Sequence, residues 1–375
     1  MRLLRCYTSL PALAIVLLVA TASRAEESSP AWAKIAPHFS PPAEYAGKYG
    51  KYRSPLLFDD GTRVRSAEDW QRRRKEVLDH WHGVMGAWPA VIEKPQIEYV
   101  EKKRRENFTQ HKVRVETARG QMTDGYLLVP DGPGPFPAVF VPFYEAETST
   151  GQNDKVLRDF AYQLTKRGFV TLSVGSPGGD ARNPDTAGAV LQPLSYLGYV
   201  GANCYQALAS LPQVDAKRVG AVGHSYGGKW AMFASCLYDK YAAAAWSDGG
   251  VVWDEARPNV NYWEPWYLGL DPKLERKRGV ITKDSPRTGA YQTLVEGGRD
   301  LHELHALMAP RPFLVSGGSE DPPARWEALN HAVAVNKLLG RENRVGMTNR
   351  ATHDPTAESN EVIYLFFEHF LKGGE

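Results

Sequence analysis

The pattern of apolar and polar residues changes along the chain. Between residues 26 and 60 no period is clear, and proline, glycine, serine and tyrosine are frequent. This composition predicts an extended arm on the surface of a larger domain. A helical period follows from Trp70 to Met85, with a charged opposite face, and Ser66-Ala67-Glu68-Asp69 before it matches a capping box. The broad apolar side of this helix consists of Trp70, Val77, Leu78, Trp81 and Val84.

Apolar and polar residues alternate between Ile97 and Pro130, which is typical of strands with one buried face. Beyond residue 137, short apolar runs are separated by helical stretches, the pattern of a mostly parallel sheet covered on both faces. The fold class is therefore α/β, with the antiparallel strands at one edge. The predicted strands are 97–100, 111–117, 125–130, 138–142, 169–174, 219–222, 241–246, 312–316 and 345–348. The predicted helices are 155–167, 191–211, the stretch after Ser225, 302–308, 325–339 and 361–371.

The alternation of strands and helices is interrupted from Trp253 to Arg287, where the sequence becomes aromatic and charged. An insertion of this size between strands often lies as a cap over a site. Exposed aromatic rings there, above all Trp263 and Trp266, could stack on the apolar face of a sugar or hold an aryl group. The alternative is that these rings pin the insertion onto the sheet.

The first 25 residues have the features of a secretory signal peptide. Arg2 and Arg5 precede an apolar stretch from Leu13 to Ala20, and Ser23-Arg24-Ala25 forms a small-x-small cleavage site. The expected division is a signal peptide at 1–25, an arm and helix at 26–92, and the main domain at 93–375. We expect a secreted or periplasmic protein without stable membrane insertion after cleavage; an uncleaved anchor is the alternative.

The charge balance excludes a strongly basic or acidic protein. The sequence has 45 Lys and Arg against 43 Asp and Glu, and cleavage after Ala25 would remove three arginines. A nearly neutral protein gives no electrostatic reason to expect nucleic acid as a partner. Cys204 and Cys236 would remain, and the sequence leaves open whether they pair or stay as buried thiols.

A serine stands at a predicted strand-to-helix turn. Gly223-His224-Ser225-Tyr226-Gly227 has the G-x-S-x-G spacing, in which glycines allow a turn so tight that the serine is pushed clear of the sheet. Ser225 is therefore the candidate nucleophile, and the alternative is a glycine-rich structural turn. His224, next to it, is expected to pack or orient.

A serine hydroxyl needs a base to take its proton, and the base needs an acid to orient it. In this kind of sheet the order along the chain is serine, acid, histidine. His353 follows the last strand and is the candidate base. Asp321, after the strand at 312–316, is the first choice of acid, with Glu320 and Asp248 as alternatives.

The developing oxyanion would need N–H donors. The backbone of Tyr226 is expected to supply one, and Tyr144, in the loop after the strand at 138–142, is the candidate for the other. His302 and His305 do not have zinc-peptidase spacing, so no metal site is expected. The serine mechanism itself requires no organic cofactor.

From Ile97 onward the chain resembles the α/β-hydrolase superfamily. Met308-Ala-Pro-Arg-Pro-Phe and the late histidine are similar to its dienelactone-hydrolase-like and acetyl xylan esterase-like branch, although a dienelactone hydrolase would have cysteine at the elbow. The run Gly-His-Ser225-Tyr-Gly-Gly-Lys229 is similar to Gly-Cys-Ser-Arg-x-Gly-Lys of glucuronoyl esterases. That resemblance implies that Lys229 contacts sugar hydroxyls, whereas Tyr226 replaces the family's arginine.

These observations predict a secreted serine esterase that cleaves small-molecule or polysaccharide esters, most simply carbohydrate esters of acetyl xylan or glucuronoyl type. The alternatives are a peptidase of the prolyl oligopeptidase type and a non-catalytic binding protein with a hydrolase fold. The roughly 70 residues of mature chain before the sheet are too few for the propeller that such peptidases carry.

Overall fold

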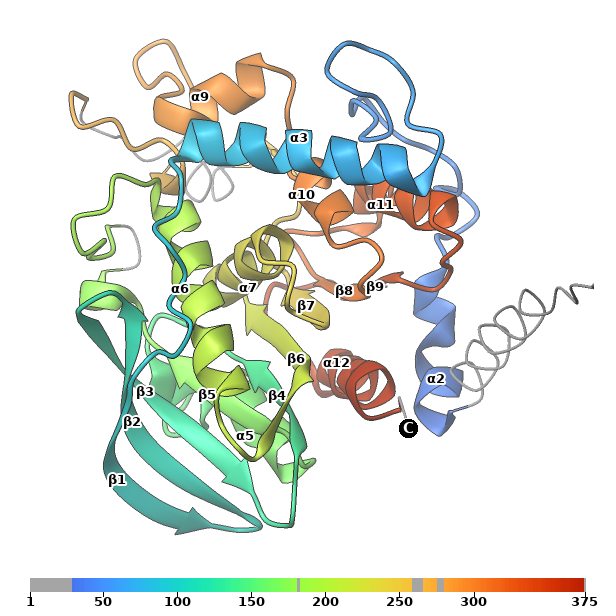
Figure 1. Cartoon of the computed structure of the whole chain (residues 1–375). Helices are drawn as coiled ribbons and strands as arrows, with labels where there is room; N and C mark the ends of the chain where they lie inside the picture. The colour runs from blue at the N-terminus through green and yellow to red at the C-terminus, as the bar shows by residue number, and fades with distance from the viewer. Residues whose placement is uncertain (1–28, 181–182, 258–265, 275–279, 374–375) are drawn as a thin grey trace, which may run out of the picture.

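Within the described residues, the strands form one mixed nine-stranded sheet (Figure 1). The computed structural model describes residues 29–180, 183–257, 266–274 and 280–373. In spatial order the strands are β1 (Ile97–Arg105), β2 (Phe108–Ala118), β3 (Gln121–Pro130), β5 (Val170–Val174), β4 (Phe136–Phe140), β6 (Val214–His224), β7 (Ala243–Ser247), β8 (Phe313–Gly317) and β9 (Val345–Asn349). Pairing is antiparallel from β1 to β5 and parallel from β5 to β9. The predicted α/β class and its antiparallel edge are confirmed.

Helices cover both faces of the sheet. Alternate residues of β4 show why: Ala138 and Phe140 enter one apolar cluster, whereas Val139 enters another on the opposite face. The first cluster includes α3 (Ala67–Met85), α6 (Pro193–Ala209), α7 (Tyr226–Leu237), α9 (Gly289–Glu296), α10 (His302–Leu307) and α11 (Trp326–Leu338). The second includes α2 (Pro30–Ile35), α5 (Phe160–Lys166) and α12 (Ala357–Phe367). The short elements are α4 (Ala146–Ser149), η1 (Ala36–Phe39), η2 (Pro177–Gly179), η3 (Pro323–Arg325) and η4 (Glu368–Lys372).

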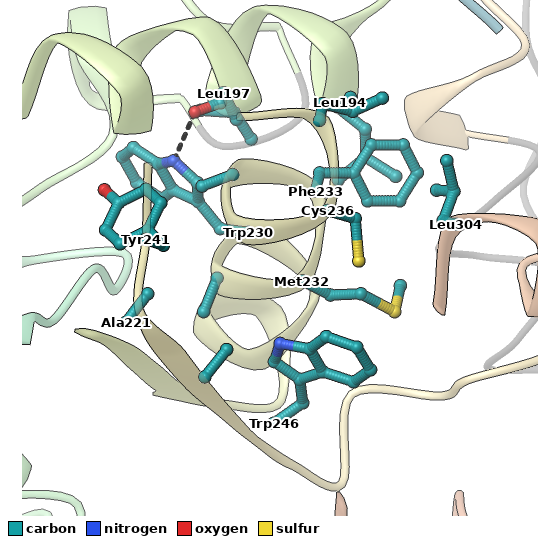
Figure 2. Packing of buried hydrophobic residues seen from close by; sticks show 14 of the residues in the cluster. Leu194, Leu197, Ala221, Trp230, Met232, Phe233, Cys236, Tyr241, Trp246 and Leu304 are labelled. Carbon is teal, nitrogen blue, oxygen red and sulfur yellow. Dashed lines mark hydrogen bonds between the residues drawn. The ribbon is translucent and has the colours of Figure 1, made fainter. Parts of the chain in front are cut away.

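The helix that follows the predicted elbow lies deep in the first cluster (Figure 2). Every residue of α7 is buried, which is why its sequence is apolar on all sides. The indole of Trp230 donates a hydrogen bond to the carbonyl oxygen of Leu197 on α6, with 2.5 Å between the two atoms. On the other side of α7, Met232 and Cys236 lie near Trp246 (Figure 2). The start of α7 is therefore fixed by packing along the whole helix.

The arm at 26–60 differs from the extended segment that the sequence predicted. Ser29 caps a short helix, α2, with Pro30 at its first position, and Trp32 and Ile35 are buried. A serine cap followed by proline is a helix start signal. The helix was not predicted because the residues after this proline show no clear apolar period. The ring of Trp32 stacks on His369 with 5.0 Å between centroids, so the arm docks on the C-terminal helical segment.

Some helix boundaries in the structure differ from the predicted ones for local reasons. Ser66 caps α3 as predicted and accepts the N–H of Asp69. The helix predicted at 155–167 begins only at Phe160, because Leu157 has a φ of +62° that a right-handed helix cannot include. Helix α9 was not predicted. Across the part of the chain that the structure describes, every helix lacks either the length or the apolar character needed to cross a bilayer.

Candidate active site

Ser225 occupies the turn between β6 and α7, as the G-x-S-x-G spacing predicted. Its φ of +55° and ψ of −119° lie in a region that residues with side chains rarely adopt. The Ser225 N–H donates to the carbonyl oxygen of Ser247, at the end of the neighbouring strand β7, over 2.7 Å. Strain at this residue is thus offset by the sheet and by the buried helix behind it.

The two flanking glycines are required by close backbone contacts. A Cβ atom at Gly223 would lie 2.2 Å from the Gly227 carbonyl oxygen, and one at Gly227 would lie 2.3 Å from that of Pro142. Both distances are far inside van der Waals contact. Pro142 belongs to the loop after β4, so the elbow rests directly against the loop expected to supply an oxyanion donor.

His353 joins the serine to a carboxylate. Its Nε2 lies 2.8 Å from Ser225 Oγ, and its Nδ1 lies 2.7 Å from Asp248 Oδ2. His353 is in the loop after β9 and is partly exposed, whereas the Asp248 side chain is fully buried. The structure therefore brings together the predicted serine, the predicted histidine and the alternative acid.

Asp248 is held by the loop in which the first-choice acid was expected. It follows β7 with a φ of +48°, and its Oδ1 accepts the N–H of Gly318 at 2.6 Å and of Asp321 at 3.0 Å. The other oxygen is thereby left facing His353 Nδ1. These backbone donors fix the orientation of the Asp248 carboxylate.

The predicted contact between Asp321 and His353 is wrong. Asp321 is fully buried, and its two oxygens accept the N–H groups of Gly250 and Val251 at 2.9 and 2.7 Å. Burial, together with the nearby charge of Asp248, raises the pKa of Asp321 to about 6. Asp321 thus holds the turn that follows Asp248. Both acids lie in loops at the carboxyl ends of the adjacent strands β7 and β8, so the sequence could not separate them.

Glu320, the other alternative acid, points elsewhere. Its carboxylate accepts from Arg257 Nη2 at 3.1 Å, and its backbone N–H donates to Asp248 Oδ1 at the same distance. Glu320 therefore supports Asp248 through its backbone rather than through its carboxylate.

The predicted oxyanion region contains two stacked tyrosines. The rings of Tyr144 and Tyr226 are 4.3 Å apart and nearly parallel, and the Tyr226 hydroxyl lies 3.0 Å from Ser176 Oγ. Tyr226 is the first residue of α7, where backbone N–H groups have no acceptor within the helix. The Tyr226 ring is buried among other aromatic rings. The side chain that stands where the glucuronoyl esterase pattern has arginine is therefore directed into the core.

His224 packs against the candidate base, in line with the expected orienting role. Its ring centroid is 4.8 Å from that of His353, and its Nδ1 lies 3.2 Å from Ser247 Oγ. Burial, and then the neighbouring His353, lower the pKa of His224 well below its usual value. A neutral ring therefore supports the back of His353.

The predicted substrate contacts lie in different surroundings. Lys229 is 1% exposed, and its ammonium donates to the carbonyl oxygen of Gly250, so its sugar-binding role stays a prediction. Trp266 is partly buried against the first apolar cluster, which favours the pinning alternative for that ring. Trp263 lies outside the described residues. Of the cap predicted at 253–287, the structure describes 253–257, 266–274 and 280–287.

The remaining candidate ligands are structural in their contacts. His302 Nε2 lies 2.7 Å from the carbonyl oxygen of Arg53, and His305 is buried beside Trp246. Within the described residues, no group of three or more His, Cys, Asp or Glu is placed to hold a metal ion. Cys204 and Cys236 are both free, buried thiols.

A polar groove lies beyond the stacked tyrosines. Its volume is about 620 Å³, and Lys112, Asp124, Glu147, Ser176 and Gly179 are among its lining residues. Ser176 is the residue that contacts the Tyr226 hydroxyl, so one wall of the groove reaches the residue beside Ser225. The groove could not be predicted from the sequence, because its lining comes from the consecutive strands β2 and β3, from α4 and from the loop after β5, which are separate along the chain.

The fold and site together define an α/β hydrolase with a serine-histidine-aspartate arrangement. A family model described as "Esterase FrsA-like" matches residues 94–256, a stretch that includes Ser225 and Asp248 but ends before His353. A curated relative, the carbohydrate esterase MZ0003 from an unknown prokaryotic organism, is 24% identical over 190 residues, which are 43% of this chain. They are 40% of that relative, so the chain spans less than half of its length.

Solved structures share the fold over most of the chain. A glucuronoyl esterase from Solibacter usitatus is 19% identical, with a TM-score of 0.67 over 86% of this chain and 97% of that one. A glucuronoyl esterase from Sporotrichum thermophile, solved with methyl 4-O-methyl-β-D-glucopyranuronate, is 16% identical, with a TM-score of 0.55 over 87% of this chain and 89% of that one. At these identities the likeness establishes the fold.

Proposed function

We propose that this protein is a serine hydrolase that cleaves carboxylic esters of carbohydrates. The observation that carries the proposal is the continuous contact from Ser225 Oγ through His353 to Asp248, with steps of 2.8 and 2.7 Å, on a strained elbow. The same three groups in this geometry activate a serine on unrelated folds.

In the proposed reaction, Ser225 Oγ attacks the ester carbonyl carbon while His353 Nε2 takes the hydroxyl proton. The carbonyl π electrons move to the oxygen, which becomes an oxyanion that the N–H of Tyr226 and a donor in the Tyr144 loop would bind. As the oxyanion collapses, the ester C–O bond breaks, and the alcohol leaves with the proton from Nε2. Water then attacks the acyl-serine with His353 again as base, which releases the acid and restores Ser225.

Asp248 would keep His353 in the reactive tautomer. Because Asp248 Oδ2 accepts at Nδ1, the proton of neutral His353 resides on Nδ1, and Nε2 is left as the acceptor for the serine proton. Once Nε2 is protonated, the buried carboxylate stabilises the imidazolium. Both effects depend on the position of the Asp248 carboxylate, which the N–H groups of Gly318 and Asp321 hold in place.

Carbohydrate esters are the proposed substrates because the similar proteins named above are a carbohydrate esterase and glucuronoyl esterases. The groove of about 620 Å³ beside the site offers charged and hydroxyl groups to further sugar residues. Because a buried tyrosine, Tyr226, stands where the glucuronoyl esterase pattern has arginine, acetylated xylan is proposed as a substrate beside glucuronate esters.

Labelling with a fluorophosphonate probe tests the reaction class. We expect label on Ser225 in the folded protein and its loss in Ser225→Ala, whereas Ser210→Ala, an exposed serine at the end of α6, should label normally. Failure of the unaltered protein to label would refute the serine mechanism. Assays on acetylated xylan and on a methyl glucuronate ester test the substrate class, and inactivity on both would exclude it.

Export is a separate proposal that rests on the N-terminal sequence alone. Residues 1–28 lie outside the described part of the chain. Expression with the complete N-terminus, followed by N-terminal sequencing, should find a mature chain that begins at Glu26. A chain that keeps Met1 would contradict cleavage.

A further inference from the structure

Arg350 lies beside the candidate triad, and the sequence did not point to it. It directly follows β9 and precedes His353 by three residues. Its guanidinium lies between the carboxyl ends of β7 and β8 and the loop that carries His353, where it contacts Ser247, Ser316 and His353.

The first set of contacts closes the histidine loop. Arg350 Nη2 donates to the carbonyl oxygen of His353 at 2.7 Å, and Nε donates to that of Asp354 at 2.8 Å. Because both acceptors are backbone atoms, these bonds fix the path of the loop at the residue that carries the imidazole.

The second set of contacts reaches groups that hold Ser225 and Asp248. Arg350 Nη1 donates to the carbonyl oxygen of Ser316 at 2.8 Å, and the same oxygen accepts the N–H of Asp248 at 3.0 Å. Arg350 Nη2 also lies 3.3 Å from the hydroxyl of Ser247, whose carbonyl oxygen accepts the Ser225 N–H. One side chain therefore contacts groups directly bonded to serine, histidine and aspartate.

The chemistry of these contacts selects arginine. The acceptors are carbonyl and hydroxyl oxygens of four residues, and a planar guanidinium with five N–H donors can serve them together. An ammonium group has three donors at a single point and cannot span the same set.

We propose that Arg350 is a positioning residue that holds His353 in register with Ser225 and Asp248. This inference rests on the proposed serine mechanism and deepens it. Without the guanidinium, the His353 loop loses its bonds to β7 and β8, so Nε2 moves relative to Ser225 Oγ. A shift of about 1 Å at a reacting group costs about 100-fold in rate.

The test compares Arg350→Ala and Arg350→Lys with the unaltered protein. We expect kcat for a small aryl ester to fall about 100-fold in Arg350→Ala, with KM nearly unchanged. The kcat of Arg350→Lys should lie between those of Arg350→Ala and the unaltered protein. Guanidinium or methylguanidinium ion, added well below denaturing concentrations, should restore part of the activity of Arg350→Ala. Ammonium ion should not, because it lacks the planar set of donors.

Arg311→Ala is the matched control. Arg311 also donates to backbone carbonyl oxygens, those of Ser235, Tyr241 and Leu307, but its acceptors lie away from the triad. Its loss should lower the denaturation midpoint while the folded protein keeps its kcat. If Arg350→Ala does not fold, Arg350→Lys, which keeps the cation and most of the stem, carries the comparison.

The outcomes separate this inference from the function on which it rests. No fluorophosphonate label on the unaltered protein refutes the serine mechanism itself. Normal labelling of the unaltered protein, with an equal rate in Arg350→Ala or Arg350→Lys, overturns only the role of Arg350. A loss of kcat that guanidinium does not restore, and that Arg311→Ala reproduces, also overturns it, because the effect would then be general destabilisation.

Discussion

Replacing Asp248 with asparagine is the sharpest test of the acid assignment. Oδ1 of Asp248 accepts backbone N–H groups at 2.6 and 3.0 Å, so an asparagine would keep its carbonyl oxygen there and turn its amide N–H toward His353 Nδ1. The histidine would then have to accept at Nδ1 and carry its proton on Nε2. In that tautomer it cannot take the Ser225 proton, and a loss of kcat of about 10⁴-fold is expected.

Asp321→Asn is the matched comparison, because Asp321 is equally buried and lies in the loop after the adjacent strand, β8. Its carboxylate accepts the N–H groups of Gly250 and Val251 and lies 3.9 Å from Arg325 Nε, so the kcat of Asp321→Asn should fall far less than that of Asp248→Asn. The assay is kcat for p-nitrophenyl acetate, with circular dichroism to show that each variant is folded. Near-normal activity in Asp248→Asn together with a large loss in Asp321→Asn would refute the assignment.

Three further predictions concern the fold around the site. Gly227→Ala should prevent formation of the elbow, because the added Cβ would lie 2.3 Å from the Pro142 carbonyl oxygen; an active, normally stable variant in esterase and melting assays would contradict this. Burial lowers the pKa of His302 from 6.5 to about 3, so its contribution to stability is complete above pH 6.5 and is lost as pH falls toward 3. Urea unfolding at pH 7 and pH 4.5 should show a smaller loss in His302→Gln than in the unaltered protein, and equal losses would disprove the linkage. Burial raises the pKa of both Cys204 and Cys236, so a thiol reagent should react with neither until the protein unfolds; rapid reaction in native buffer would show that the helices open.

The sequence predicted those parts of the site that depend on local structure. The elbow needs only a strand, small residues and a helix, all contiguous around Ser225, and His353 could be placed because it follows the last strand. The choice between Asp248 and Asp321 depends on which of two neighbouring strand ends faces the histidine loop. Asp248 directly follows β7, and Asp321 lies in the loop four residues beyond the end of β8. Both strands are short apolar runs, so the pattern of apolar residues does not distinguish the two acids.

Longer-range features could not be read in this way. The helix α2 was missed because its few apolar residues complete less than two turns, and their burial depends on the C-terminal helices. Arg350 looked like one more polar loop residue, because its acceptors belong to residues 34 and 103 positions away. Side chains whose role depends on several distant backbone atoms leave no periodic signal.

The docking of α2 has a consequence for how the chain folds. Ser29 Oγ lies 2.8 Å from His369 Nδ1, so the first described residue contacts one of the last. Contacts separated by 340 residues are the slowest to form, because the whole intervening chain must be brought into place first. We expect α2 and α12 to join the native structure late and to open together, which hydrogen exchange would detect as matching protection of their amides. On this expectation, α2 and the C-terminal helical segment contact each other only after the sheet that carries Ser225 has formed.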